Sequence, residues 1–293
     1  MSRSPLICTY CGNRTFVRAG ESPPLPECLG CANRYVPEPT GDRERFADPD
    51  AARADHTMDI VQLEEDVWRL HVHPVLGIRH YAWFIERPGG NVLMDMQPLL
   101  TDDLEAWIAS RGGLKTIILS HPHYYGAMDE FSTRFEAPIR MHVADKAWPA
   151  GYPNVEFFDA ESLDLDDAIR VHHIPAQFEG GLCLLYGRHG GILFPGDTIM
   201  ISPSTGELTS WKNTPRRVPY HLEEYRNIRK KIMALKFDQI YASVRGEVRS
   251  GAKGLADGFT REYLESTAVP TVEEQRRLLE EEREVPESET FFR

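Results

Sequence analysis

The chain lacks the features of a membrane or secreted protein. Its apolar runs all fall short of the ~20 residues that a membrane-spanning helix needs, and the stretch from Met1 to Pro5 carries no apolar signal core. Cysteine is also scarce, with five in 293 residues. Four of the five stand in two Cys-x-x-Cys pairs, which favours a metal site in a reducing compartment over a framework of disulfides. We therefore expect a cytoplasmic protein.

Positive charge is in short supply as well. The chain has 33 lysines and arginines against 45 acidic residues, a net charge of −12, which argues against nucleic acid or an anionic membrane as the main partner. The sequence contains no glycine-rich phosphate loop, no Gly-x-Ser-x-Gly elbow and no internal repeat. We expect a small-molecule substrate as the partner, and a chain long enough to bury a large core in one or two domains.

The cysteine pairs have the spacing of a structural metal site. Cys8 and Cys11 form one pair and Cys28 and Cys31 the other, with 16 residues between the pairs. Two such knuckles can enclose a tetrahedral ion, and so short a segment depends on that ion for much of its folding energy. The spacing predicts a zinc ribbon over residues 1–38, with iron as the alternative because tetrahedral sulfur sites suit both metals. Residues 39–56 are predicted to be a linker.

Two histidines follow a short apolar run, and this stretch is the centre of the functional interpretation. Thr116 to Leu119 has the pattern of a buried strand, and Pro122 cannot continue it. His121 and His123 therefore stand in a loop just past a strand end, where two imidazoles can converge on one metal ion. A second apolar run, Gly191 to Phe194, leads to Asp197 in the same way. Loops at strand ends are where such folds place their chemistry.

The remaining pattern alternates between strands and helices, as in an α+β protein. Val67 to Val72, Tyr81 to Ile85 and Asn91 to Asp95 are predicted to be early strands. Further strands are expected at 138–143, 169–174, 181–186, 191–194 and 237–242, with 181–186 and 191–194 forming a hairpin. Helices are expected at about 102–110, capped by Thr101-Asp102-Asp103, at 127–134 and at 222–234.

This order of elements, with Ser120-His-Pro-His-Tyr-Tyr125 in one loop and Gly196-Asp197 in another, resembles the metallo-β-lactamase fold. The resemblance covers residues 57–265. It implies a metallo-β-lactamase-like αββα sandwich preceded by the zinc ribbon, and a metal-dependent hydrolase as the activity. Residues 266–293 would then be a charged C-terminal tail.

The resemblance also implies a set of site residues. His121 and His123 match the first two metal ligands of the family, and Asp197 matches its metal-bridging aspartate. Tyr125 and Gly126 stand where the family has Asp and His, and Gln177 stands where it has its third His.

Two further positions complete the comparison with the family motif. Asp95 matches the acid behind the metal site, whereas the last His, expected at 241–247, is absent.

One metal ion, not two, is what this ligand set implies. Two imidazoles and one carboxylate suit Zn²⁺ with an open position, as in hydrolases, and also the facial triad of Fe²⁺. The expected ligands are His121, His123 and Asp197, with Gln177 as a weak fourth through its amide oxygen. The same three residues and Tyr125, whose hydroxyl would lie near the metal, form the expected catalytic set. His172 or His173 could replace the missing ligand, but on an alternating strand one is expected to point outward and the other into the core.

Three functions of different classes fit this sequence. The first is a mononuclear metal-dependent hydrolase of unknown substrate. The second is a non-hydrolytic, metal-dependent oxidoreductase that uses the two-His-one-carboxylate set. The third is a non-catalytic binding protein, with the zinc ribbon as the surface that docks a protein partner.

Overall fold

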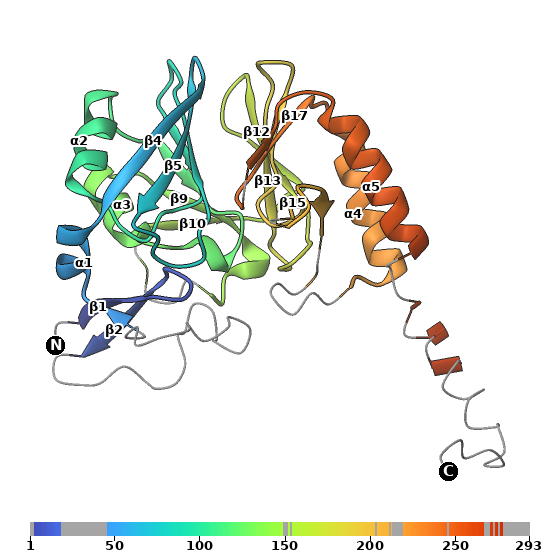
Figure 1. The fold of residues 1–293 in the computed structure, drawn as a ribbon, viewed down its shortest axis with the longest axis horizontal. Helices are drawn as coiled ribbons and strands as arrows, with labels where there is room; N and C mark the ends of the chain where they lie inside the picture. The colour runs from blue at the N-terminus through green and yellow to red at the C-terminus, as the bar shows by residue number, and fades with distance from the viewer. Residues whose placement is uncertain are drawn as a thin grey trace, which may run out of the picture.

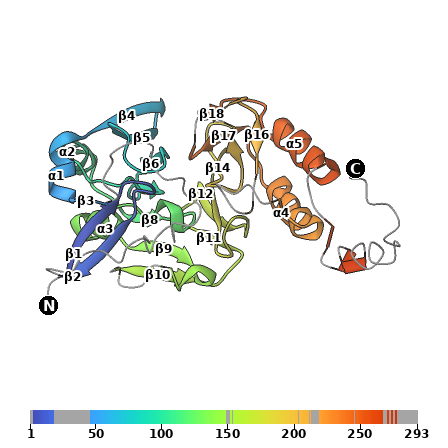
Figure 2. The same cartoon turned by 60° about the horizontal axis from the view of Figure 1, so that its bottom comes forward.

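The computed structural model describes most of the chain. The described residues are 3–18, 46–148, 152, 154–202, 204–210, 212, 219–244, 246–266, 270–271, 273–274 and 276–277. Two large mixed sheets stand face to face, with helices on their outer sides and the N-terminal hairpin below the first sheet (Figure 1). Figure 2 shows the same halves from another direction, with α1, α2 and β4 to β10 on one side and the helices α4 and α5 at the far edge of the other.

The first sheet has seven strands and the second has six. In spatial order, the first sheet contains β10 (Val155–Phe158), β9 (Ile139–His142), β8 (Thr116–Ile118), β7 (Val92–Met94), β6 (Ala82–Ile85), β5 (Val67–His73) and β4 (Thr57–Glu64). The second contains β11 (Ser162–Asp164), β12 (Ile169–His173), β13 (Leu182–Tyr186), β14 (Ile192–Phe194), β17 (Gln239–Ala242) and β18 (Gly246–Val248). The strands from β7 to β10 run parallel, as do β14 and β17, while the other pairs are antiparallel.

Aromatic and branched side chains between the two sheets form the inner core. Trp83 of β6 packs against Phe194 of β14 and Tyr241 of β17, with ring centroids 5.5 Å and 5.3 Å apart. All three are fully buried, together with Met94 and Ile118 from the first sheet. Burial of these large rings on both inner faces supplies much of the free energy that holds the sheets together.

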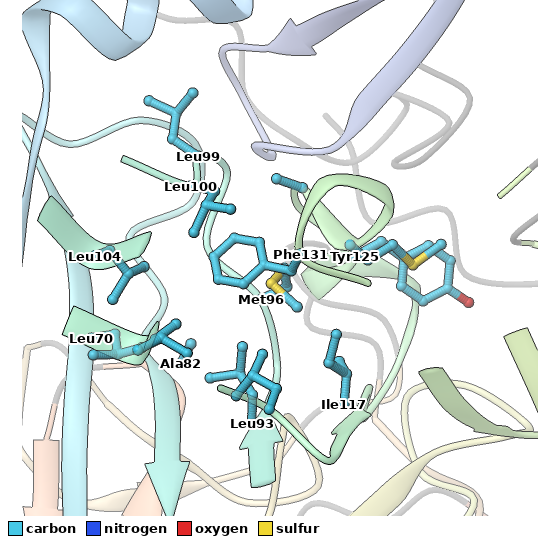
Figure 3. Close-up of a cluster of buried hydrophobic side chains, with 14 of the residues drawn as sticks. Leu70, Ala82, Leu93, Met96, Leu99, Leu100, Leu104, Ile117, Tyr125 and Phe131 are labelled. Atoms are coloured by element: carbon cyan, nitrogen blue, oxygen red, sulfur yellow. The ribbon is translucent and has the colours of Figure 1, made fainter. Parts of the chain in front are cut away.

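Helices cover the outer face of each sheet. α2 (Asp102–Ser110) and α3 (Met128–Phe135) pack on the first sheet, with Leu104 and Phe131 in a buried cluster that Figure 3 shows beside Leu93 and Ile117. α4 (Leu222–Ala234) and α5 (Ala252–Ser266) cover the second sheet, and Tyr225, Ile228 and Ile232 of α4 point inward at helical spacing. Helix, sheet, sheet and helix follow one another, which confirms the predicted αββα sandwich.

The predicted helices and strands are largely present, with some differences at their ends. α4 has the predicted bounds, and the hairpin of β13 and β14 is antiparallel as expected. Thr101 is the N-cap of α2, yet its hydroxyl makes no capping bond to a described residue, contrary to the sequence-based expectation. α5 was not predicted. Among the described residues, no helix is both long and apolar enough to cross a bilayer.

The N-terminal segment is a small sheet that carries two of the four cysteines of the predicted ribbon. β1 (Arg3–Cys8) pairs with β2 (Arg14–Arg18) and with β3 (Phe46–Ala47), and both pairs are antiparallel. A separate two-stranded antiparallel sheet consists of β15 (Met200–Ile201) and β16 (Leu208–Thr209). Cys8 and Cys11 are buried at the turn between β1 and β2. The other predicted ligands, Cys28 and Cys31, lie outside the described residues.

Part of the predicted linker is folded. Residues 46–55, expected within it, form β3 and helix α1 (Pro49–Asp55). Asp48 caps this helix by accepting hydrogen bonds from the amides of Asp50 and Ala51, both at 3.0 Å, and Pro49 begins it. Ala52 is buried against the first sheet. The mixed charges of this stretch led to the prediction of a linker, whereas the Asp48 cap starts a helix there.

Candidate metal centre

Five strands bring polar residues to one edge of the sandwich. Asp95 follows β7, the His121 loop follows β8, and Asp197 follows β14. Gln177 and Ser243 stand beyond the ends of β12 and β17. Because β7 and β8 run parallel in one sheet and β14 and β17 run parallel in the other, their carboxyl ends open at the same edge. The topology therefore gathers residues that are far apart in the sequence.

His121, His123 and Asp197 form the one cluster of metal-binding side chains found among the described residues. Their ligand atoms all lie within 4.8 Å of one another. His121 and Asp197 are buried, whereas His123 is half-buried and stands nearest to solvent. Nε2 of His121 lies 3.2 Å from Oδ2 of Asp197 without a well-aligned hydrogen bond to any described residue. Buried polar atoms facing one another in this way are suited to a shared cation.

The Asp197 carboxylate is held in its ionised form. Burial opposes the charge, but the neighbouring His121 imidazole and the hydrogen bond from the Tyr124 hydroxyl hold the pKa of Asp197 below its usual value. Tyr124 donates to Oδ1, so Oδ2 is the oxygen that faces His121. Behind Tyr124, the His80 ring stacks on the phenol at 4.3 Å and an interplanar angle of 14°. A negative ligand is thus fixed in one orientation.

A buried hydrogen-bond chain orients His121. Its Nδ1 lies 2.8 Å from the Ser120 hydroxyl, which leaves Nε2 as the nitrogen that faces Asp197. Asp95 accepts from the Ser120 amide at 2.8 Å and from the Ser243 hydroxyl at 3.1 Å. Burial raises the pKa of Asp95 to about 6 despite these bonds. Asp95 lies behind the site, as expected, and Ser243 occupies the region where the last family His was expected.

Gln177 and Phe178 cover the two histidines from the second sheet. The amide nitrogen of Gln177 lies 3.4 Å from Nδ1 of His123, and the Phe178 ring lies 5.4 Å and 5.0 Å from the rings of His121 and His123. Asp145 anchors this turn by accepting from the Gly180 amide at 2.9 Å. Gln177 thus lies beside the cluster, and its role as a fourth ligand stays a prediction.

The Tyr125 hydroxyl was expected to lie near the metal, but the structure places this side chain in the outer core of the first sheet. The hydroxyl that meets Asp197 belongs to Tyr124, while the Tyr125 ring packs in the outer core of the first sheet (Figure 3). The Tyr125 hydroxyl makes no hydrogen bond to a described residue, and burial raises the pKa of this phenol. Gly126 has a φ of +48°, and a Cβ there would lie 2.4 Å from the carbonyl oxygen of Gln97. The backbone at this position excludes any side chain.

The alternative histidines of β12 have other neighbours. His172 is half-buried opposite Cys183, and His173 stacks on His142 with centroids 3.6 Å apart. Neither belongs to the metal-binding cluster. Sequence reasoning did not single out His80 or Asp145. Their roles depend on a ring stack and a loop contact that link distant residues, and local sequence carries no signal for either.

Comparisons with known proteins agree with this fold. The chain is 28% identical over 252 residues to the uncharacterized protein YmaE of Bacillus subtilis (strain 168), covering 84% of this chain and 90% of that protein. The fold is similar to the DIM-1 metallo-β-lactamase, with a TM-score of 0.53 and 12% identity over 70% of this chain and 97% of that one. It is also similar to the Flv1 flavodiiron core from Synechocystis sp. PCC6803, with a TM-score of 0.54 and 14% identity over 72% of this chain and 61% of that one. The family model of the metallo-beta-lactamase superfamily matches residues 76–243, more than half of the sequence, and the chain therefore belongs to this superfamily.

Proposed function

We propose that this protein is a metal-dependent hydrolase that acts on a small molecule through a single divalent cation. The observation that carries the proposal is the cluster of His121, His123 and Asp197, whose ligand atoms lie within 4.8 Å of one another at the edge where the strands end. Membership in the metallo-β-lactamase superfamily supports metal-dependent hydrolysis as the broad class of chemistry.

The donor set fits a divalent cation. Two neutral imidazoles and one carboxylate match the ligand type of Zn²⁺ sites and of Fe²⁺ facial triads. The supporting bonds fit as well, because Ser120 orients His121 and Tyr124 orients Asp197. A cation bound there would supply Lewis-acid activation of a substrate carbonyl or of water.

Three features support one cation over two. Gly126 stands at one family ligand position, and its contact with Gln97 leaves no room for a side chain. The neighbouring Tyr125 is turned into the core, and Oδ1 of Asp197, which could bridge to a second ion, accepts a hydrogen bond from Tyr124. These features remove ligands that a second ion would use, which supports a single cation.

The other residues of the site have roles that follow from their positions. Asp197, kept ionised and bonded to Tyr124 through Oδ1, presents Oδ2 as a negatively charged ligand for the cation. Phe178 screens the two histidines from water, and Trp148, 43% exposed, packs on it with ring centroids 5.4 Å apart. This aromatic wall beside the half-buried His123 favours a substrate with an apolar group next to its scissile bond.

The test is the metal content per chain, together with hydrolysis of a panel of esters, lactones and thioesters. We expect the wild type to hold one equivalent more than His123→Ala, and hydrolysis to fall to background in that variant. His221→Ala, which changes a histidine outside the cluster, is the control and should match the wild type. Hydrolysis that survives His123→Ala would overturn the proposal.

A metal-dependent oxidoreductase is the second candidate. The same ligand set suits Fe²⁺, and the fold resembles a flavodiiron core. Iron as the His123-dependent metal, with O₂ consumption in the presence of a reductant, would replace hydrolysis by this function. If no zinc, iron or manganese binds in a His123-dependent way, the chain is a non-catalytic binding protein.

A further inference from the structure

The N-terminal cysteine turn contacts the histidine loop directly, through Asn13. The Asn13 side chain donates to the carbonyl of Pro122 at 2.8 Å and accepts from the amide of Gly126 at 2.9 Å. Both bonds are buried, and Asn13 is 1% exposed. Pro122 stands between His121 and His123, and Gly126 ends the loop. One amide therefore fixes the loop at two points, on either side of His123.

Asn13 is in turn part of the cysteine turn. Its backbone amide donates to Sγ of Cys11 at 3.4 Å, and its carbonyl accepts from the amide of Cys8 at 2.9 Å. The amide of Gly12 donates to the carbonyl of Cys8 at 2.8 Å, which closes the turn. The position of the Asn13 side chain thus depends on the fold of residues 8–13.

The turn is packed tightly on the main domain. A Cβ at Gly12, whose φ is +82°, would lie 2.6 Å from the ring of Pro98, and one at Gly77 would lie 2.7 Å from the Gly12 amide nitrogen. The next residue, Arg14, has a side chain only 4% exposed and forms an ion pair with Glu130 of α3. Backbone contact of this closeness leaves the turn little freedom to shift without moving the loop.

We propose that the cysteine turn, residues 8–13, is a positioning element of the candidate metal centre and acts through Asn13. The two bonds hold the backbone that carries His121 and His123. Less conformational entropy is therefore lost when the cation binds, because the loop is already ordered. An event that unfolds the turn lowers the affinity of the centre for its cation. This inference rests on the metal centre of the proposed function and extends it to the N-terminal segment.

The test compares two buried asparagines. Asn13→Ala removes the contact, whereas Asn91→Ala removes an asparagine that is 3% exposed and makes bonds of the same kind, to the carbonyls of Arg111 and Gly113, at the other end of the sheet. Zn²⁺ affinity is measured by competition with a chromophoric chelator, with His123→Ala as the background that isolates the main centre. We expect Asn13→Ala to lower this affinity about 10–100-fold, the usual effect of losing a residue that orients metal ligands, and Asn91→Ala to leave it unchanged.

Asn13→Asp is a second variant, made in case Asn13→Ala does not fold. It keeps the size of the side chain and the acceptor for Gly126, but it loses the donor to Pro122, so its affinity should also fall. Hydrogen exchange of residues 121–126 in the protein as purified should become faster in both Asn13 variants. Equal affinities in Asn13→Ala and the wild type, or equal losses in Asn13→Ala and Asn91→Ala, would overturn the inference alone. A wild type with no His123-dependent Zn²⁺ would overturn the proposed centre together with it.

Discussion

Tyr124 and Tyr125 are adjacent residues in opposite environments. Tyr124 lies between His80 and Asp197 at the metal centre, and Tyr125 lies among apolar side chains of the outer core. The short 3₁₀ turn Pro122–Tyr124 decides which phenol meets Asp197. Alignment of the sequence with the family motif pointed to Tyr125, because a motif gives the order of residues and not the direction in which a turn aims them.

Replacing Tyr124 with Phe should weaken cation binding without disturbing the fold. The variant keeps the ring stacked on His80 but removes the hydrogen bond that orients Asp197. We expect Zn²⁺ affinity of the His123-dependent centre to fall about 10–100-fold, measured by chelator competition. Tyr125→Phe removes a hydroxyl that has no hydrogen-bond partner among the described residues, and its affinity should equal that of the wild type. The same loss in both variants would show that the Asp197 contact is unimportant.

His80 makes the stability of the protein depend on pH. Burial lowers the pKa of His80 to about 4, although its bond to the Met96 carbonyl opposes the shift. In the unfolded chain the pKa returns to about 6.5, so the unfolded state binds more protons between these values. The contribution of His80 is therefore complete above pH 6.5 and is lost as the pH falls toward 4.

The change is measurable by urea unfolding of the metal-free protein at two pH values. Between pH 7.5 and 5, protonation of His80 in the unfolded state should lower the free energy of unfolding by about 2 kcal/mol. His80→Gln supplies an amide donor for the Met96 carbonyl but cannot be protonated. Its free energy of unfolding should therefore fall by about 2 kcal/mol less than that of the wild type over this pH range. Asp95, whose pKa burial raises to about 6, acts in the opposite direction, so the difference between wild type and variant isolates His80. Identical pH dependence in the two proteins would refute the assignment.

At the scale of elements, the sequence predicted the strands and loops that carry the candidate metal ligands. The apolar runs before His121 and Asp197 are three-residue strands, β8 and β14, and both are fully buried as their composition indicates. Three helices were predicted near their observed bounds because apolar residues recur at helical spacing. α5 was missed because Gly254 and Gly258 lower its helix propensity, and the helix depends on packing against α4 and the second sheet.

Contacts between elements were beyond local patterns. Asn13 bonds to residues 109 and 113 positions away, and Asp145 of a short 3₁₀ turn holds the Gly180 turn that bears Phe178 over the histidines. Neither pairing leaves a periodic or motif signal in its own segment. The candidate ligands His121, His123 and Asp197 could therefore be proposed from the sequence, whereas the residues that orient them could be found only in the fold.

At the scale of the whole molecule, the two ends of the sandwich carry different groups of polar side chains. The carboxyl ends of the parallel strands carry the candidate metal centre, and the opposite end carries a network of charged and phenolic groups. There Arg87, beyond β6, bonds to Asp166 at 2.6 Å and to the Tyr186 hydroxyl at 3.3 Å, and Tyr186 donates to Asp66. These contacts join the first sheet to the second at the end away from the histidines.

Because the ends are separate, stability and metal binding should be separable. Arg87→Met removes an arginine whose side chain is 3% exposed and leaves Asp166 without its cation, although the amides of Ala168 and Ile169 still donate to it. We expect the free energy of unfolding in urea to fall by about 2 kcal/mol, with Zn²⁺ affinity of the His123-dependent centre unchanged. Arg170→Met, which breaks an exposed pair with Asp164, should have a smaller effect on unfolding. A loss of Zn²⁺ affinity in Arg87→Met would mean that the network at one end also sets the spacing of the sheets at the other.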